Sequence, residues 1–214
     1  MTSNKLKHKI KRLLNPRGNY YSLLGFKSHK FIFVHIPKTG GIAVLKSLVG
    51  SLGAGHSNMR WYKDHLSVSQ YRTFLKVTIV RDPIERFISA INFLALGGLN
   101  EEDNKWSVAH YTSGFDINQY VQFSLEQHIS TYVHLRSQSS FLKDDTGTIN
   151  MDFIARFETL EQDYQHICQL LSVRKPLLRK NVTGVKTFSI DVLSVASVSK
   201  LKELYADDYR NFKY

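Results

Sequence analysis

The chain has a single cysteine and no apolar run long enough to cross a bilayer. One Cys among 214 residues, Cys168, excludes an internal disulfide framework, and its place in a helical pattern predicts a core position. No stretch approaches the ~18 consecutive apolar residues of a membrane span, and the N-terminus lacks the apolar core of a signal peptide. We therefore expect a cytoplasmic protein with reduced thiols.

Acidic residues are absent from the first 63 positions, which contain twelve Lys or Arg. From Asp64 onward 17 basic and 18 acidic residues nearly balance, so the net charge of +11 is entirely N-terminal. Such a field favours nucleotides, polyanionic glycans, nucleic acid or an anionic membrane surface; a solvated arm that only aids solubility is the alternative. We interpret residues 1–30 as a basic N-terminal arm, with an amphipathic helix at 5–14 suited to peripheral membrane contact.

Hydrophobic residues make up 43% of the chain and aromatic residues 12%, which predicts a globular fold with a substantial core. Strands alternate with helices, so we predict an α/β fold with a central, mostly parallel sheet flanked by helices, in a single domain over 31–214. The patterns indicate strands at 31–34, 76–80 and 149–157, helices at about 41–49, 68–75, 83–96, 117–127, 159–171 and 191–212, and loops at 51–62, with strand character toward 60–62, and at 100–115.

The stretch 31–48, FIFVHIPKTGGIAVLKSL, is a strand, a glycine turn and an amphipathic helix in that order. The first N–H groups of a helix have no intrahelical partner and carry a partial positive charge, so this order makes an anion site. Gly40 and Gly41 allow close approach of the backbone, and Lys38 adds a full charge. This is not a Walker pattern, because Lys38 precedes the glycines. An ordinary helix start with a solvated lysine is the alternative.

A second strand leads into a helix over residues 76–98. The residues that follow the strand suit a helix start, with an N-cap, a first-turn proline and a capping-box acid at Asp82, Pro83 and Glu85. Ligands of open parallel sheets bind beyond the carboxyl ends of the strands, and both Lys38 and Arg81 follow strands. The two positions suggest a ligand with two separated phosphate-like groups. The alternative is a well-formed helix start with Arg81 in a surface ion pair.

PKTGG after a strand, with RDPIERFIS some forty residues later, resembles the sulfotransferases that use 3′-phosphoadenosine 5′-phosphosulfate. The resemblance is to the carbohydrate branch that includes heparan sulfate 2-O-sulfotransferases, and it is specific over about residues 31–98. Weaker agreement continues through HLRSQSSFL (134–142), Glu158, Asn181, Tyr205, Asp208, Phe212 and Tyr214. It implies a P-loop-like three-layer fold and transfer of a sulfuryl group to a hydroxyl of a carbohydrate or glycan acceptor.

The resemblance also implies roles for particular residues. The 5′-phosphosulfate would be held by the first loop, which comprises Pro37, Lys38, Thr39, Gly40 and Gly41. The 3′-phosphate would be bound by Arg81 and Ser89. The segment DHLS (64–67) looks like the histidine segment that supplies the base in the 2-O branch, which makes His65 the candidate to take the acceptor proton. Lys38 would stabilise charge on the departing 5′-phosphate, with no metal required.

Two features depart from the family pattern. Ile42 and Ala43 replace the small hydroxyl residues that usually follow the glycines, so a side-chain contact to the 5′ group is lost while backbone donors remain. Lys63 stands where the 2-O enzymes carry a second histidine. The resemblance therefore does not imply that this chain has the acceptor specificity of the 2-O enzymes.

Two other functions compete with sulfuryl transfer. A kinase-like phosphotransferase would use Asp82 to hold Mg²⁺, but the following proline and the order of the first loop argue against it. A non-catalytic polyanion or membrane-surface binder would explain the basic N-terminal part but not the two loops. We therefore expect an enzyme with a carbohydrate partner rather than a nucleic acid partner.

Overall fold

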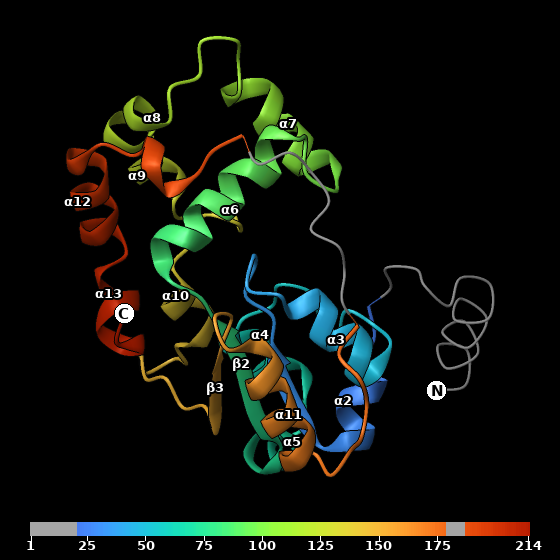
Figure 1. The fold of residues 1–214 in the computed structure, drawn as a ribbon. Helices are drawn as coiled ribbons and strands as arrows, with labels where there is room; N and C mark the ends of the chain where they lie inside the picture. Colours follow the sequence, from blue (N-terminus) through green and yellow to red (C-terminus); the bar gives the residue numbers. More distant parts are fainter. Residues whose placement is uncertain (1–20, 179–186) are drawn as a thin grey trace. The chain divides into compact units, whose positions relative to one another are not determined.

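The computed structural model describes residues 21–178 and 187–214 (Figure 1). The amphipathic helix predicted at 5–14, and Asn181, lie outside these residues. The described chain forms two compact units: a sheet unit of residues 21–80 and 141–178, and a helical unit of residues 81–140 and 187–214. Part of the predicted arm belongs to the sheet unit, because Leu24–His29 forms helix α2 and buries Phe26 completely.

The sheet confirms the predicted α/β fold with a parallel sheet flanked by helices. Strands β1 (Phe31–Val34), β2 (Leu75–Val80) and β3 (Phe153–Arg156) pair in the order β1-β2-β3, and both pairs are parallel. All of β1 and the last five residues of β2 are buried, so elements cover both faces of these strands. Figure 1 shows α2 beside β1 and helix α11 (Leu160–Leu170) against β3. The third strand is shorter than the predicted 149–157.

The other helices of the sheet unit are α3 (Gly41–Val49), α4 (Met59–His65) and α5 (Val68–Thr73). Helices α3 and α5 confirm the predictions, and Ser67 and Gln70 close a capping box on α5. The strand character predicted toward 60–62 is wrong. Asn58 accepts a hydrogen bond from the Trp61 N–H at 3.0 Å and so starts a helix there. Helix α4 buries only Met59 and Tyr62, too few residues to give a clear periodic signal.

Helix α6 (Pro83–Ala95) is central to the helical unit. It packs with α7 (Glu101–His110), α8 (Ile117–Phe123), α9 (Leu125–His128), the short turn η1 (Ile190–Val192), α12 (Val195–Leu204) and α13 (Ala206–Phe212). Helix α10 (Gln138–Leu142) begins in this unit. The core joins apolar residues of α6 to buried aromatic and leucine side chains, which are Trp106, Tyr120, Leu125, Leu135, Leu201 and Tyr205.

Three predictions in the helical unit are wrong in part. The predicted helix 117–127 is divided at Ser124 into α8 and α9. The loop predicted at 100–115 contains α7, which Asn100 caps by accepting from the Asp103 N–H and which buries Trp106 completely. The predicted helix 191–212 is interrupted near Tyr205, whose hydroxyl donates to the Leu135 carbonyl at 2.7 Å. Cys168 is buried, as predicted. Across residues 21–178 and 187–214, no helix has both the length and the apolar character needed to cross a bilayer.

Candidate active site

The first loop joins β1 to α3 through two residues with left-handed backbone conformation. Gly40 is the N-cap of α3 at φ 82°, and Lys38 has a φ of 68° despite its Cβ. The buried Thr39 donates its hydroxyl proton to the Ile36 carbonyl at 2.9 Å, which closes the turn on itself. The loop therefore presents the N-terminus of α3 and the Lys38 side chain from a fixed backbone.

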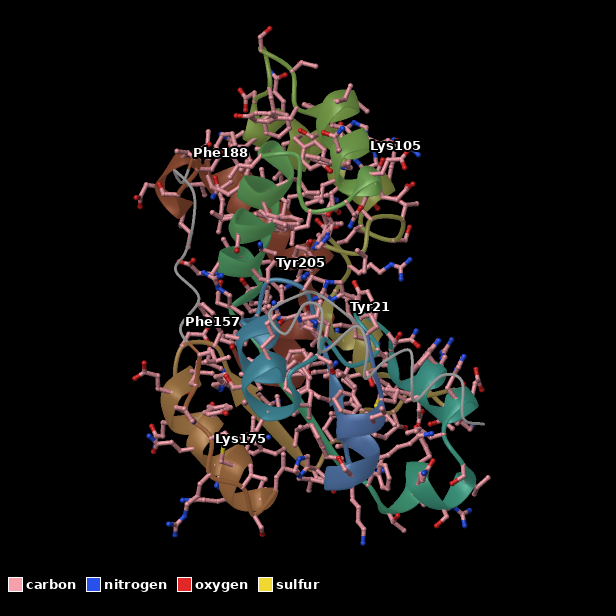
Figure 2. All side chains as sticks on the ribbon, turned by 90° about the vertical axis from the view of Figure 1, so that its right-hand side faces the viewer. Tyr21, Lys105, Phe157, Lys175, Phe188 and Tyr205 are labelled. Carbon is pink, nitrogen blue, oxygen red and sulfur yellow. The ribbon has the colours of Figure 1, made fainter. Side chains whose placement is uncertain are left out.

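Aromatic side chains pack against both glycines of this loop. A Cβ on Gly41 would lie 2.8 Å from the Nε2 atom of the buried His35, and one on Gly40 would lie 3.2 Å from Phe157, which is labelled in Figure 2. The ring centroids of His35 and His56 lie 4.4 Å apart, and His56 Nδ1 is 2.9 Å from the His35 carbonyl oxygen. His56 was not expected at this loop, because only the fold brings it there.

The second loop begins at Arg81, directly after β2. Asp82 caps α6 as predicted, accepting from the Glu85 N–H at 2.9 Å. The Arg81 guanidinium donates to the Glu85 carboxylate at 3.0 Å, and the Arg81 side chain is only 15% exposed. The ion pair that the alternative interpretation gave Arg81 is thus present, with the arginine side chain largely shielded and the Glu85 side chain 46% exposed. Ser89, further along α6, is half-buried.

Gln138 holds the main chain of Arg81. The Arg81 N–H donates to Gln138 Oε1 at 2.9 Å, and Gln138 Nε2 donates to the Arg81 carbonyl at 2.7 Å. Gln138 is completely buried at the start of α10. No role had been expected for it, although it lies in the segment 134–142 that agrees weakly with the family pattern.

Arg86, the second arginine of RDPIERFIS, has a structural place. It is completely buried, donates to the His134 carbonyl at 3.1 Å and also donates to the Arg136 carbonyl. Its guanidinium carbon lies 5.6 Å from the ring centre of Tyr205, which is labelled in Figure 2. Burial raises the pKa of the Tyr205 hydroxyl. Arg86 therefore joins α6 to the segment 134–136 through two main-chain carbonyls.

His65 is the last residue of α4, and its side chain is exposed. Its ring stacks on Trp61, with centroids 3.9 Å apart and an interplanar angle of 13°. His65 Nδ1 lies 2.8 Å from the Trp61 carbonyl oxygen. Because a carbonyl oxygen can only accept, Nδ1 carries the proton, and in the neutral ring Nε2 holds the free lone pair. The ring is therefore oriented as a proton acceptor through Nε2.

Lys63 lies two residues before His65 and forms an ion pair with Asp145. The hydrogen bond to the Asp145 carboxylate raises the pKa of the Lys63 ammonium group. Arg60 reaches the same turn through the Asp144 carbonyl at 3.3 Å. Both cations on α4 thus face the turn at 144–147.

The candidate residues divide between the two units: 37–41 and His65 belong to the sheet unit, and Arg81 and Ser89 to the helical unit. Strands β1 and β2 are parallel neighbours in the sheet, so the residues after Val34 and after Val80 start from the same edge. In the two described stretches, no group of three or more His, Cys, Asp or Glu residues is arranged to hold a metal ion.

A family model and a curated protein match this chain over most of its length. The model of the family described as "Sulfotransferase family" matches residues 22–214. Human carbohydrate sulfotransferase 9 is 24% identical over 235 aligned residues, which cover 87% of this chain and 51% of the human protein. The chain therefore spans about half the length of that curated relative. No solved structure gives a significant match.

Proposed function

Since the chain belongs to the sulfotransferase family, we propose that it transfers a sulfuryl group from 3′-phosphoadenosine 5′-phosphosulfate to a hydroxyl of a carbohydrate. The observation that carries the proposal is the Lys38–Gly41 turn, which presents a cation and a helix N-terminus directly after a buried parallel strand. Asp82 caps α6 through its carboxylate, which argues against the kinase-like alternative with Mg²⁺ at that position.

The 5′ end of the donor is assigned to the first loop, residues 37–41. The Thr39 hydroxyl donates to the Ile36 carbonyl, so backbone N–H groups and the Lys38 ammonium group are the donors to an incoming anion. Ile42 and Ala43 have no side-chain donor, so at these two positions only the main chain can donate to the 5′ group. The packing of His35 and Phe157 around the glycines keeps the turn in its shape before a ligand binds.

The 3′-phosphate of the donor is assigned to Arg81 and Ser89. Arg81 already has a carboxylate partner in Glu85 at 3.0 Å, and the Glu85 side chain is 46% exposed. A phosphate dianion would compete for the guanidinium, and Glu85 is free to turn toward water. A bidentate phosphate contact by arginine is stronger than a pair with one exposed carboxylate.

The chemistry is an in-line displacement at sulfur. The acceptor oxygen forms a bond to sulfur, the bond from sulfur to the 5′-phosphate oxygen breaks, and the acceptor proton passes to His65 Nε2. Lys38 stabilises the negative charge that develops on the departing 5′-phosphate. The products are the sulfated carbohydrate and adenosine 3′,5′-bisphosphate. The Nδ1 contact with the Trp61 carbonyl keeps the basic nitrogen at Nε2.

Thermal shift with nucleotides tests the proposal. Adenosine 3′,5′-bisphosphate is expected to raise the melting temperature without metal, because it binds only the folded protein. A response to ATP with Mg²⁺ alone would favour the kinase-like alternative, and no response to either nucleotide would favour the non-catalytic binder.

Variants test the assigned roles. Lys38→Ala and Arg81→Ala should weaken bisphosphate binding, whereas Lys27→Ala, an exposed lysine on α2, should not. His65→Ala should keep bisphosphate binding and lose transfer of labelled sulfate to a carbohydrate acceptor. His166→Ala, an exposed histidine on α11, is the matched control. Full transfer activity in His65→Ala would remove His65 as the base.

A further inference from the structure

The side-chain amide of Gln138 forms two hydrogen bonds with the main chain of one residue, Arg81. Its amide oxygen accepts from the Arg81 N–H at 2.9 Å and its amide nitrogen donates to the Arg81 carbonyl at 2.7 Å. The side chain is completely buried, so neither bond is exchanged with water. Two hydrogen bonds to the N–H and the carbonyl of one residue fix the main chain on both sides of its Cα. The point from which the Arg81 side chain starts is therefore set by Gln138.

Asp208 in turn fixes Gln138. Its two carboxylate oxygens accept from the main-chain N–H groups of Gln138 and Ser139, each at 2.8 Å. Asp208 is also completely buried, and a carboxylate that accepts two N–H bonds at the start of a helix is a charge-assisted contact. Asn211, on the same helix α13, donates to the Ser139 hydroxyl at 3.0 Å. Helix α13 thus holds the first turn of α10.

These contacts make a continuous series from Asp208 through Gln138 to Arg81, all within the helical unit. The series ends at the guanidinium, which forms an ion pair with the half-exposed Glu85 carboxylate. When the Arg81 side chain exchanges the Glu85 carboxylate for a phosphate, its guanidinium keeps its direction only if the Arg81 main chain does not move. A misplacement of about 1 Å can cost roughly 100-fold in rate at a reacting group. The bidentate contact of an arginine with a phosphate is likewise specific in its geometry.

We infer that Gln138 and Asp208 are positioning residues that aim Arg81 at the 3′-phosphate and so set the preference for a 3′-phosphorylated donor. This inference rests on the proposed function. It predicts that the two residues affect recognition of one phosphate group, while the rest of the nucleotide is bound as before.

The readout is a ratio of dissociation constants, that for adenosine 5′-monophosphate divided by that for adenosine 3′,5′-bisphosphate, which reports the 3′-phosphate alone. Gln138→Leu keeps the approximate size of the side chain and removes both hydrogen bonds. We expect it to lower the ratio about tenfold or more, mainly by weakening the bisphosphate. Asp208→Asn leaves one of the two N–H groups without its acceptor, so we expect a smaller fall in the same direction.

Asn118→Leu is the matched control. Asn118 also binds main-chain groups through its side-chain amide, since it donates to the Val192 carbonyl at 2.9 Å and accepts from the Ser194 N–H at 2.8 Å. It lies on α8, within the same unit. This variant removes two side-chain hydrogen bonds to the main chain, as Gln138→Leu does, and should keep the ratio of the unmodified protein. In an Arg81→Ala background, Gln138→Leu should not change the ratio further, because its partner guanidinium is gone.

The outcomes separate the inference from the function on which it rests. A ratio near one in the unmodified protein would overturn both the proposed donor and the inference. A high ratio that persists in folded Gln138→Leu would overturn the inference alone. If Gln138→Leu does not fold, as judged by circular dichroism, Asp208→Asn decides: an unchanged ratio refutes the positioning role and a lowered one supports it.

Discussion

The substitution Gly41→Ala tests whether the first loop is held by packing on its glycines. Gly41 is the first residue of α3, where alanine would ordinarily be welcome. Its added Cβ would lie 2.8 Å from His35 Nε2, 3.1 Å from His35 Cγ and closer still to His35 Cδ2. The ring has little room to retreat, because it is 4% exposed and lies 4.4 Å from the ring of His56.

Crowding of this kind costs about 1–3 kcal/mol in other cores. For a chain of about 200 residues, each kcal/mol corresponds to roughly 2–4 °C in melting temperature. His35→Ala removes all three ring atoms that the new methyl group meets. In that background Gly41→Ala should change sign and stabilise the protein by up to about 1 kcal/mol, the difference in helix propensity between alanine and glycine.

Urea unfolding of the four proteins of this double-mutant cycle measures the effect. Gly114→Ala is the control, since nothing lies within 4 Å of a Cβ placed there. Bisphosphate binding should weaken in Gly41→Ala and recover in part in the double variant. If the two substitutions add to within about 0.5 kcal/mol, the steric reasoning is refuted.

Three further expectations concern stability. Arg86→Met should cost about 1–3 kcal/mol for each carbonyl left without its donor, read from the urea midpoint; a cost below about 0.5 kcal/mol would contradict the structural role given to Arg86. Asn58→Ala should cost about 1 kcal/mol by removing the cap of α4, and Asn58→Asp, which keeps the acceptor oxygen, should not. Burial lowers the pKa of His110, and burial together with the charge of His110 lowers the pKa of His128. Both histidines therefore bind a proton at higher pH in the unfolded chain than in the folded protein. Stability should therefore fall as the pH drops below about 6.5, and His110→Gln with His128→Gln should flatten melting temperature against pH between 7.5 and 5.

Features set by neighbouring residues were predictable from the sequence. The strand, glycine turn and helix at 31–48 and the cap at Asp82 follow from local patterns, and the structure has them. Helix α7 was missed because its residues are mostly polar and only Asp103 and Trp106 are buried. The burial of Trp106 depends on two aromatic neighbours from later segments, Tyr120 and Tyr132.

The candidate site was predictable only at its two loops. Gln138 stands 57 residues from Arg81 and 70 residues from Asp208, so no local pattern joins the three. The agreement of HLRSQSSFL with the family pattern was the available signal, but it did not show which side chain faces Arg81. Arg86 illustrates the opposite case: it lies within the most specific motif, and only burial shows that it contacts carbonyls.

The left-handed backbone of Lys38 has a consequence for engineering of this protein. A residue with a Cβ at φ 68° costs about 1–2 kcal/mol that glycine would not, so Lys38→Gly should raise the melting temperature slightly. The same substitution removes the cation assigned to the departing phosphate. A library screened for heat resistance alone would therefore enrich a variant without this cation. If Lys38 has the role proposed for it, thermostabilisation needs a counter-selection for turnover. An unchanged or lower melting temperature of Lys38→Gly would contradict this view.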